Sequence, residues 1–238
     1  MLDFSDIERV LVVMAHPDDV DFGAAGTVAK MTDAGIEVVY CLVTDGQAGG
    51  FDATITRDEM ASIRRQEQTK AAAEVGVTDL RFLGHMDGTV EASMRLREDI
   101  SAVIRSVRPQ VVITQSPIRD LDSTYRSHPD HLASAEATMC AVYPDARNQF
   151  AFPGTSCADL DPWEVAEVWI TFAGDTAEPV EITEQLERKI RALMMHRSQH
   201  RDPEAMEGRV RTWWQGIARS YGLPEGASAE AFRVVDTR

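Results

Sequence analysis

Short apolar runs alternate with longer amphipathic segments along this chain, and the alternation predicts its fold. The clearest runs are rich in β-branched residues and indicate buried strands over residues 10–14, 36–43 and 111–114. Between them, apolar positions recur at helical spacing over residues 23–34, 57–75 and 96–107. Strands that alternate with helices in this way predict an α/β fold, a Rossmann-like, mostly parallel sheet with helices on both faces.

The remaining segments follow the same alternation, with one long interruption. We expect strands over residues 80–83, 165–172 and 231–235, and helices over residues 132–141, 184–195 and 210–221. Residues 146–162 carry Pro, Gly, Asn and Asp without periodicity, which predicts a long loop that flanks the site and shapes specificity. Because 238 residues can bury one large core, we expect a single domain over residues 1–238.

Composition excludes several classes of partner. The net charge of −15 disfavours nucleic-acid binding, which requires clustered Lys and Arg. No apolar run reaches roughly 18 residues and the N-terminal segment is acidic, so we expect no membrane span and no signal peptide, and predict a cytoplasmic protein. The three cysteines show no C-x-x-C spacing, which argues against a thiolate metal site.

Two short motifs carry the chemistry. Ala15-His16-Pro17-Asp18-Asp19 follows the first strand, and His128-Pro129-Asp130-His131 lies between the strand over 111–114 and the next helix. Either motif alone could be a polar turn that caps a helix. Because the carboxyl ends of parallel strands lie at one edge of a sheet, we expect the two motifs to meet there. Two histidines and a carboxylate with one open coordination position suit a hydrolytic zinc ion.

Three other kinds of site lack their required residues. The segment Gly23-Ala24-Ala25-Gly26 does not provide G-x-G-x-x-G, and the carboxylates before it would repel a pyrophosphate, which argues against NAD. The chain also has no G-x-S-x-G nucleophile motif and no P-loop lysine.

The motifs resemble those of zinc-dependent N-acetylglucosaminyl deacetylases of the PIG-L or LmbE type, and the resemblance covers nearly the whole chain. Further matching stretches, in the same order, are Gly26-Thr27, Thr44-Asp45-Gly46, Arg64-x-x-Glu67, Arg108-Pro109, His196-Arg197-Ser198-Gln199 and Glu230-Ala231-Phe232. The resemblance implies an LmbE-like fold and a metal-dependent hydrolase that acts on linear amide bonds.

The resemblance also implies a role for each motif residue. His16, Asp19 and His131 would hold Zn²⁺, with Fe²⁺ as the alternative, and Asp18 would be the general base. His128 would protonate the leaving amine or stabilise the oxyanion, and Asp130 would orient His128.

Residues outside the motifs are predicted to meet the substrate. By similarity to the family, Arg64 and Asp87 would bind sugar hydroxyls, although a surface ion pair is the other reading of each. Some relatives have a Tyr two residues before the first histidine of the second motif, where this chain has Arg126, so Arg126 or the neighbouring Tyr125 would support the oxyanion.

Three other residues are expected to have packing roles. His196 is expected to pack beside the site. Trp213 and Trp214 are expected in the core or at a subunit contact, because adjacent positions on a helix cannot share one face.

The main hypothesis is hydrolysis of the N-acetyl amide of a GlcNAc-type sugar conjugate, which releases acetate and a free amine. Amidase action on a sugar-thiol conjugate would use the same residues, and a metal-retaining protein without turnover is the third reading. The expected partner is a small amino-sugar conjugate, with no nucleic acid and no membrane. The sequence leaves open the aglycone, the native metal and whether the chain forms a homo-oligomer.

Overall fold

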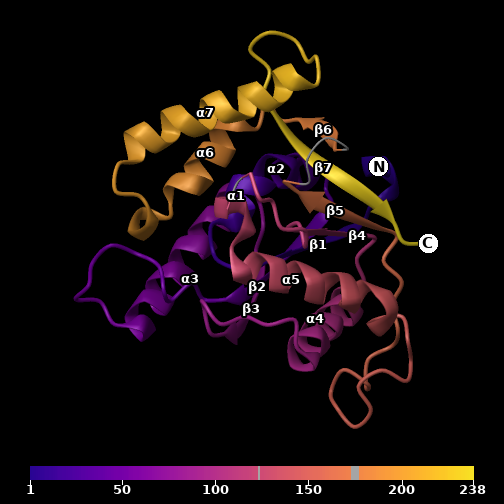
Figure 1. Ribbon diagram of the computed structural model, residues 1–238. Coiled ribbons are helices and arrows are strands. Elements are labelled where there is room, and N and C mark those ends of the chain that lie inside the picture. The colour runs from indigo at the N-terminus through magenta and orange to yellow at the C-terminus, as the bar shows by residue number, and fades with distance from the viewer. Residues whose placement is uncertain (123, 173–176) are drawn as a thin grey trace.

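A β-sheet lies at the centre of the molecule (Figure 1). The computed structural model describes residues 1–122, 124–172 and 177–238, and its sheet has seven strands in the order β3-β2-β1-β4-β5-β7-β6. The strands are β1 (Arg9–Met14), β2 (Glu37–Thr44), β3 (Asp79–His85), β4 (Val111–Thr114), β5 (Glu167–Thr171), β6 (Glu178–Glu181) and β7 (Ala229–Asp236). The strands from β3 to β5 pair in parallel, while β7 is antiparallel to both β5 and β6. The mostly parallel α/β fold predicted from the sequence is confirmed.

Helices cover both faces of this sheet. The main helices are α1 (Asp19–Gly23), α2 (Ala25–Asp33), α3 (Arg57–Glu74), α4 (Met94–Val107), α5 (Pro129–Cys140), α6 (Leu186–Met194) and α7 (Pro203–Ser220). Helices α2 and α3 contribute to the buried cluster on one face, and α4 and α5 contribute to the cluster on the other. In Figure 1, α6 and α7 lie in the upper part of the molecule and α4 in the lower part. None of the helices in the described ranges combines the length and apolar character that a membrane span needs.

Side chains along the central strands point alternately to the two faces of the sheet. Val10, Val12 and Met14 of β1 belong to the core cluster that includes residues of α2 and α3, whereas Leu11 and Val13 belong to the cluster that includes residues of α4. Because both faces of β1 are covered, its apolar run is continuous and does not alternate with polar residues.

Several elements differ from the sequence prediction. The helix expected over residues 23–34 is two helices, because the backbone leaves the helical region at Ala24 (φ −145°). Helix α7 begins at Pro203, earlier than residue 210, since the Asp202 side chain accepts a hydrogen bond from Ala205 N and Pro203 suits the first turn. The short edge strand β6 was not predicted, because it contains Pro179 and buries only Val180.

The loop over residues 146–162 does not flank the site. The buried Arg105 side chain of α4 donates hydrogen bonds to four backbone carbonyls of this loop and to that of Asp145 just before it; the four are those of Ala146, Asn148, Cys157 and Leu160. Among the described residues, none of this loop lines the cavity at the predicted site. The expectation that this loop flanks the cavity is therefore wrong, because the Arg105 side chain, in the last turn of α4, holds the loop elsewhere.

The order of the parallel strands determines where a site can form. The chain proceeds from β1 outward through β2 and β3, then returns to place β4 on the other side of β1. The connections after β1 and β4 therefore diverge to opposite faces and leave a crevice at the carboxyl ends of these strands. Both sequence motifs lie in these connections.

Candidate active site

The first motif forms a tight turn between β1 and α1. Asp18 has left-handed backbone geometry (φ 85°), and its N–H donates to Gln68 Oε1 of α3 at 2.8 Å. The buried Arg64 side chain, also from α3, donates to the carbonyls of Pro17 and Gly46. It also contacts Asp18 Oδ2 at 3.0 Å. Helix α3 thus holds the turn from one side.

Two imidazoles and one carboxylate meet in a small triangle. His16 Nδ1 lies 3.2 Å from His131 Nε2 and 3.4 Å from Asp19 Oδ2, and His131 Nε2 lies 3.2 Å from Asp19 Oδ1. Three ligand atoms around a tetrahedral zinc ion, each 2.0–2.1 Å from it, would stand roughly 3.3 Å apart. The donor types and their spacing therefore fit a zinc ion.

The second nitrogen of His16 faces two other carboxylates. His16 Nε2 lies 3.1 Å from Asp87 Oδ1 and 3.2 Å from Asp130 Oδ2. Asp130 also accepts hydrogen bonds from the N–H groups of Gly88 and Val90, and Asp87 accepts one from Ala48 N. By distance alone, this set of three could itself hold an ion, as could the three histidines of the motifs. Because backbone N–H groups already engage the two carboxylates, the arrangement is typical of partners that orient a ligand histidine.

Asp130 differs from its expected role. Its carboxylate contacts the His16 ring, while its backbone N–H donates to His128 Nδ1 at 3.2 Å. The reason is that His128 is the N-cap residue of α5, so its ring turns back onto the N–H of the first helical turn. Since Nδ1 accepts this hydrogen bond, Nε2 carries the hydrogen of the neutral ring.

Burial and charge set the proton affinities of the site. Burial raises the pKa of Asp18, and the Arg64 guanidinium only partly opposes it. Burial, followed by the positive charges of His16 and His131, lowers the pKa of His128. Burial by itself would lower the pKa of His16. Hydrogen bonds to Asp130, Asp19 and Asp87 outweigh burial and raise this pKa well above the ordinary value. A site that favours positive charge on His16 also attracts a cation.

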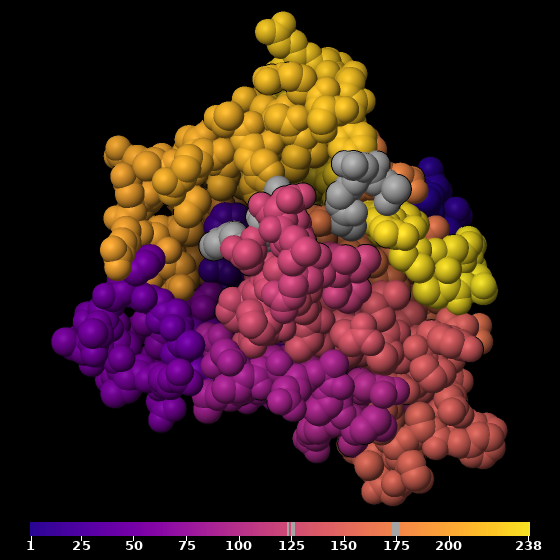
Figure 2. All heavy atoms as spheres, viewed as in Figure 1, coloured from indigo at the N-terminus to yellow at the C-terminus, as the bar shows by residue number. Residues whose placement is uncertain are grey.

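These residues line a cavity of about 870 Å³. In Figure 2, the molecule is hollowed between the α6–α7 segment (orange to yellow), the purple α3 region and the pink segment before α5, with indigo N-terminal atoms at the base. The predicted site residues that line the cavity are His16, Asp18, Asp19, Arg64, Asp87, His128 and His131. Asp130 is fully buried behind them. The side chains of Tyr125 and Arg126 lie outside the described part of the structure.

The structure also places the residues predicted outside the motifs. Arg64 and Asp87 line the cavity, where both terminal nitrogens of Arg64 and both carboxylate oxygens of Asp87 already contact protein groups. Direct sugar binding by either residue stays a prediction, and a positioning role is the alternative. His196 is buried and contacts Asp21 at 2.8 Å, and the same Asp21 oxygen accepts from Gln68. His196 thus supports the turn through Gln68, as the packing role predicted. The supporting part of Gln68 was missed, because no sequence signal links residue 68 to the N–H of residue 18.

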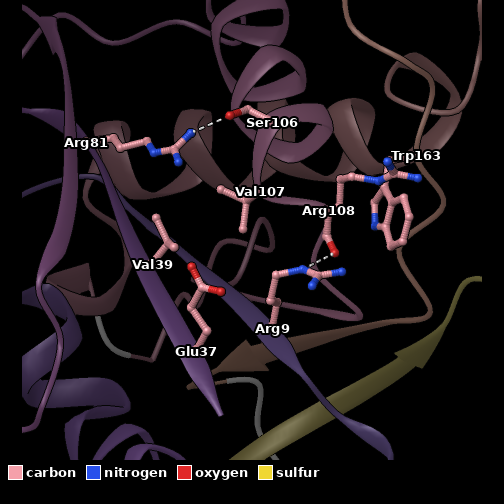
Figure 3. Close-up of a pocket in the computed structure, with 8 residues that line it drawn as sticks. All are labelled: Arg9, Glu37, Val39, Arg81, Ser106, Val107, Arg108 and Trp163. Atoms are coloured by element: carbon pink, nitrogen blue, oxygen red, sulfur yellow. Dashed lines mark hydrogen bonds between the residues drawn. The ribbon is translucent and has the colours of Figure 1, made fainter.

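A second, smaller hollow lies at the opposite edge of the sheet (Figure 3). It has a volume of about 470 Å³ and three arginines in its lining. Arg81 binds Ser106 and Asp79, Arg9 donates to the Arg108 carbonyl, and Arg108 lies over the Trp163 ring. All three guanidinium groups contact neighbouring protein groups, and these contacts account for their positions around the hollow.

Histidines and carboxylates meet at the carboxyl edge of a mostly parallel sheet, and the comparisons identify this arrangement as that of the LmbE-like class of α/β proteins. The family model described as GlcNAc-PI de-N-acetylase (PIG-L) matches residues 11–142, more than half of the chain. The diacetylchitobiose deacetylase of Thermococcus kodakarensis is 33% identical over 237 residues, which cover 98% of this chain and 85% of that protein. The chain therefore belongs to the PIG-L family of N-deacetylases.

Two further comparisons show the breadth of this likeness. A Bacillus subtilis protein named as a probable N-acetyl-α-D-glucosaminyl L-malate deacetylase 2 is 32% identical, with 81% of this chain and 83% of that protein covered. The solved structure of N,N′-diacetylchitobiose deacetylase from Pyrococcus horikoshii superposes with a TM-score of 0.86 at 29% identity, and covers 98% of this chain and 85% of that one.

Proposed function

We propose that this protein is a zinc-dependent N-deacetylase that hydrolyses the N-acetyl amide of a GlcNAc-type sugar conjugate. The observation that carries the proposal is the triangle of His16, Asp19 and His131, whose atoms are spaced as ligands of one ion. The named activities of the relatives support the substrate class. When bound, a divalent ion lowers the pKa of a water molecule and polarises an amide carbonyl.

Asp18 is the general base in this proposal. It lies beside the triangle without belonging to it. Burial raises its pKa, which makes the carboxylate a better proton acceptor. Asp18 takes one proton from the attacking water and passes it to the leaving nitrogen. The C–N bond breaks and a C–O bond forms. The products are the free amine and acetic acid, which loses its remaining proton to solvent and leaves as acetate.

His128 is the donor to the developing oxyanion. Its Nδ1 accepts the Asp130 N–H, so the neutral ring offers its Nε2 hydrogen. Burial lowers its pKa, which favours the neutral ring. A preorganised donor of this kind stabilises the charge that appears on the carbonyl oxygen. Of the two roles that the family resemblance allowed, the geometry favours this one.

The test is acetate release from N-acetylated amino sugars by the zinc-loaded protein, its chelated form and the Asp18→Asn variant. We expect chelation to abolish release and added zinc to restore it. Asp18→Asn should keep its zinc and lose at least about 100-fold in kcat, the range of a lost general base. Asp52→Asn, an exposed carboxylate in another loop, is the control.

Three results would contradict the proposal. Acetate release that persists in the metal-free protein would refute the metal dependence. Turnover by Asp18→Asn at the wild-type rate would refute the base, and no release from any N-acetyl sugar would refute the substrate class.

A further inference from the structure

The cavity has an aromatic wall that the proposed chemistry does not use. Phe22 of α1, Phe172 after β5 and Trp213 of α7 line it, and all three are partly buried. The rings of Phe172 and Trp213 are stacked, with centroids 5.6 Å apart and planes 13° from parallel. These three residues form the aromatic wall.

The wall is held in place from behind. Trp213 and Phe22 pack against the buried cluster of α6 and α7, which contains Leu186, Ile190, Leu193, Val210 and Trp214. Trp214 is fully buried and stacks with Trp213 at 6.1 Å. Because the core supports the ring, little freedom is lost when a ligand binds to it.

Phe172 has unfavourable backbone geometry at this position. Its φ is +57°, in the left-handed region that a bulky non-glycine residue rarely adopts. Such strain persists only where surrounding contacts impose it, and it is concentrated at functional sites. Here it accompanies the ring stack at the cavity surface.

We propose that the aromatic wall is an aglycone subsite, which stacks against the apolar face of a second pyranose ring linked to the N-acetylglucosamine. This inference rests on the proposed function. The volume of about 870 Å³ lies toward the upper end of the range for ligand sites, so the cavity has room beyond one sugar.

The mixture of groups favours a sugar ring over other aglycones. A pyranose has C–H groups on its faces and hydroxyls at its edge, which match an aromatic surface with polar neighbours. Arg209 lines the same cavity one helical turn before Trp213 and can donate to such hydroxyls. An alkyl chain would leave that guanidinium unused, and a small dicarboxylate would gain little from an aromatic face.

The test compares three substrates of the zinc-loaded enzyme: the methyl glycoside of N-acetylglucosamine, a disaccharide that contains it, and its octyl glycoside. In Trp213→Leu we expect the disaccharide-to-monosaccharide ratio of kcat/KM to fall about tenfold through KM. Trp213→Phe should recover most of the ratio. Trp163→Ala is the matched control, because Trp163 is also partly buried but lies at the other edge of the sheet.

A binding measurement separates this inference from the proposed function. Calorimetric titration of the disaccharide into Asp18→Asn, with and without Trp213→Leu, reports the subsite without turnover. Weaker binding in the double variant supports the subsite even if no acetate is released. An unchanged ratio and unchanged binding, or a loss confined to the octyl glycoside, would overturn it, and thermal unfolding of each variant confirms that it is folded.

Discussion

At the scale of single residues, Asp18 and Asp19 show how neighbours in sequence come to face different partners. The left-handed backbone at Asp18 turns the chain so that its carboxylate meets Arg64, while the Asp19 carboxylate meets both His16 and His131. One carboxylate can then bind a cation while the next remains available for proton transfer. Pro17 and the α3 side chains stabilise this turn.

Asp130 provides a test of how His16 is oriented. Asp130→Asn removes one of the two charged partners of His16 Nε2, and we expect the affinity for zinc to fall about 10- to 100-fold. Competition with a fluorescent chelator measures this affinity. Asp99→Asn is the matched control, because Asp99 contacts the ring of His85 at 3.0 Å but lies outside the cavity. Equal zinc affinities in both variants would contradict the supporting role of Asp130.

At the scale of elements, α2 is docked onto the antiparallel edge of the sheet by close packing and a buried charge. The Glu230 carboxylate of β7 accepts the N–H groups of Gly26 and Thr27, and pairs with the fully buried Lys189 of α6. A Cβ atom on Gly26 would lie 2.6 Å from Ile182 Cδ1. The glycine therefore permits the helix to approach the segment after β6.

Gly26→Ala should accordingly destabilise the protein. We expect a loss of about 1–3 kcal/mol in the free energy of unfolding, because the added methyl overpacks the contact with Ile182. Gly208→Ala in α7 is the control, since its Cβ would meet nothing within 4 Å and alanine favours a helix by up to about 1 kcal/mol. Denaturant unfolding measures both, and a stabilised Gly26→Ala would show that the contact is loose.

At the scale of the whole molecule, the site connects segments that are distant in the chain. His16 and Asp19 follow β1, Asp87 follows β3, and His131 belongs to α5 on the other face of the sheet. An ion bound by His16, Asp19 and His131 would therefore link the two layers of the fold. Binding that occurs only in the folded state must stabilise that state.

Zinc should therefore raise the thermal stability. At free zinc about 1,000 times the Kd, the expected gain is about 4 kcal/mol, which thermal unfolding reports as a higher Tm. His131→Ala should lose this response, because it removes one corner of the triangle. His85→Ala, with its histidine outside the cavity, should keep it. A zinc response that survives in His131→Ala would place the ion elsewhere.

The sequence by itself determined the alternation of strands and helices, the parallel core and the residues of the two motifs. These features are local, since side-chain periodicity and motif spacing depend only on neighbouring residues. It also indicated a metal site, because the histidines and aspartates of the two motifs are residue types that bind metals. The predicted strand over 111–114 and the helix over 57–75 lie within a residue of β4 and α3.

Only the tertiary structure decided which groups surround those residues. The contact of Asp130 with His16, the support of Asp18 by Gln68 and the placement of Trp213 in the cavity join segments that are tens of residues apart. Such contacts depend on how the layers pack against one another, and no local pattern records that. For the same reason the loop over 146–162 was expected at the site but is held by Arg105 away from it.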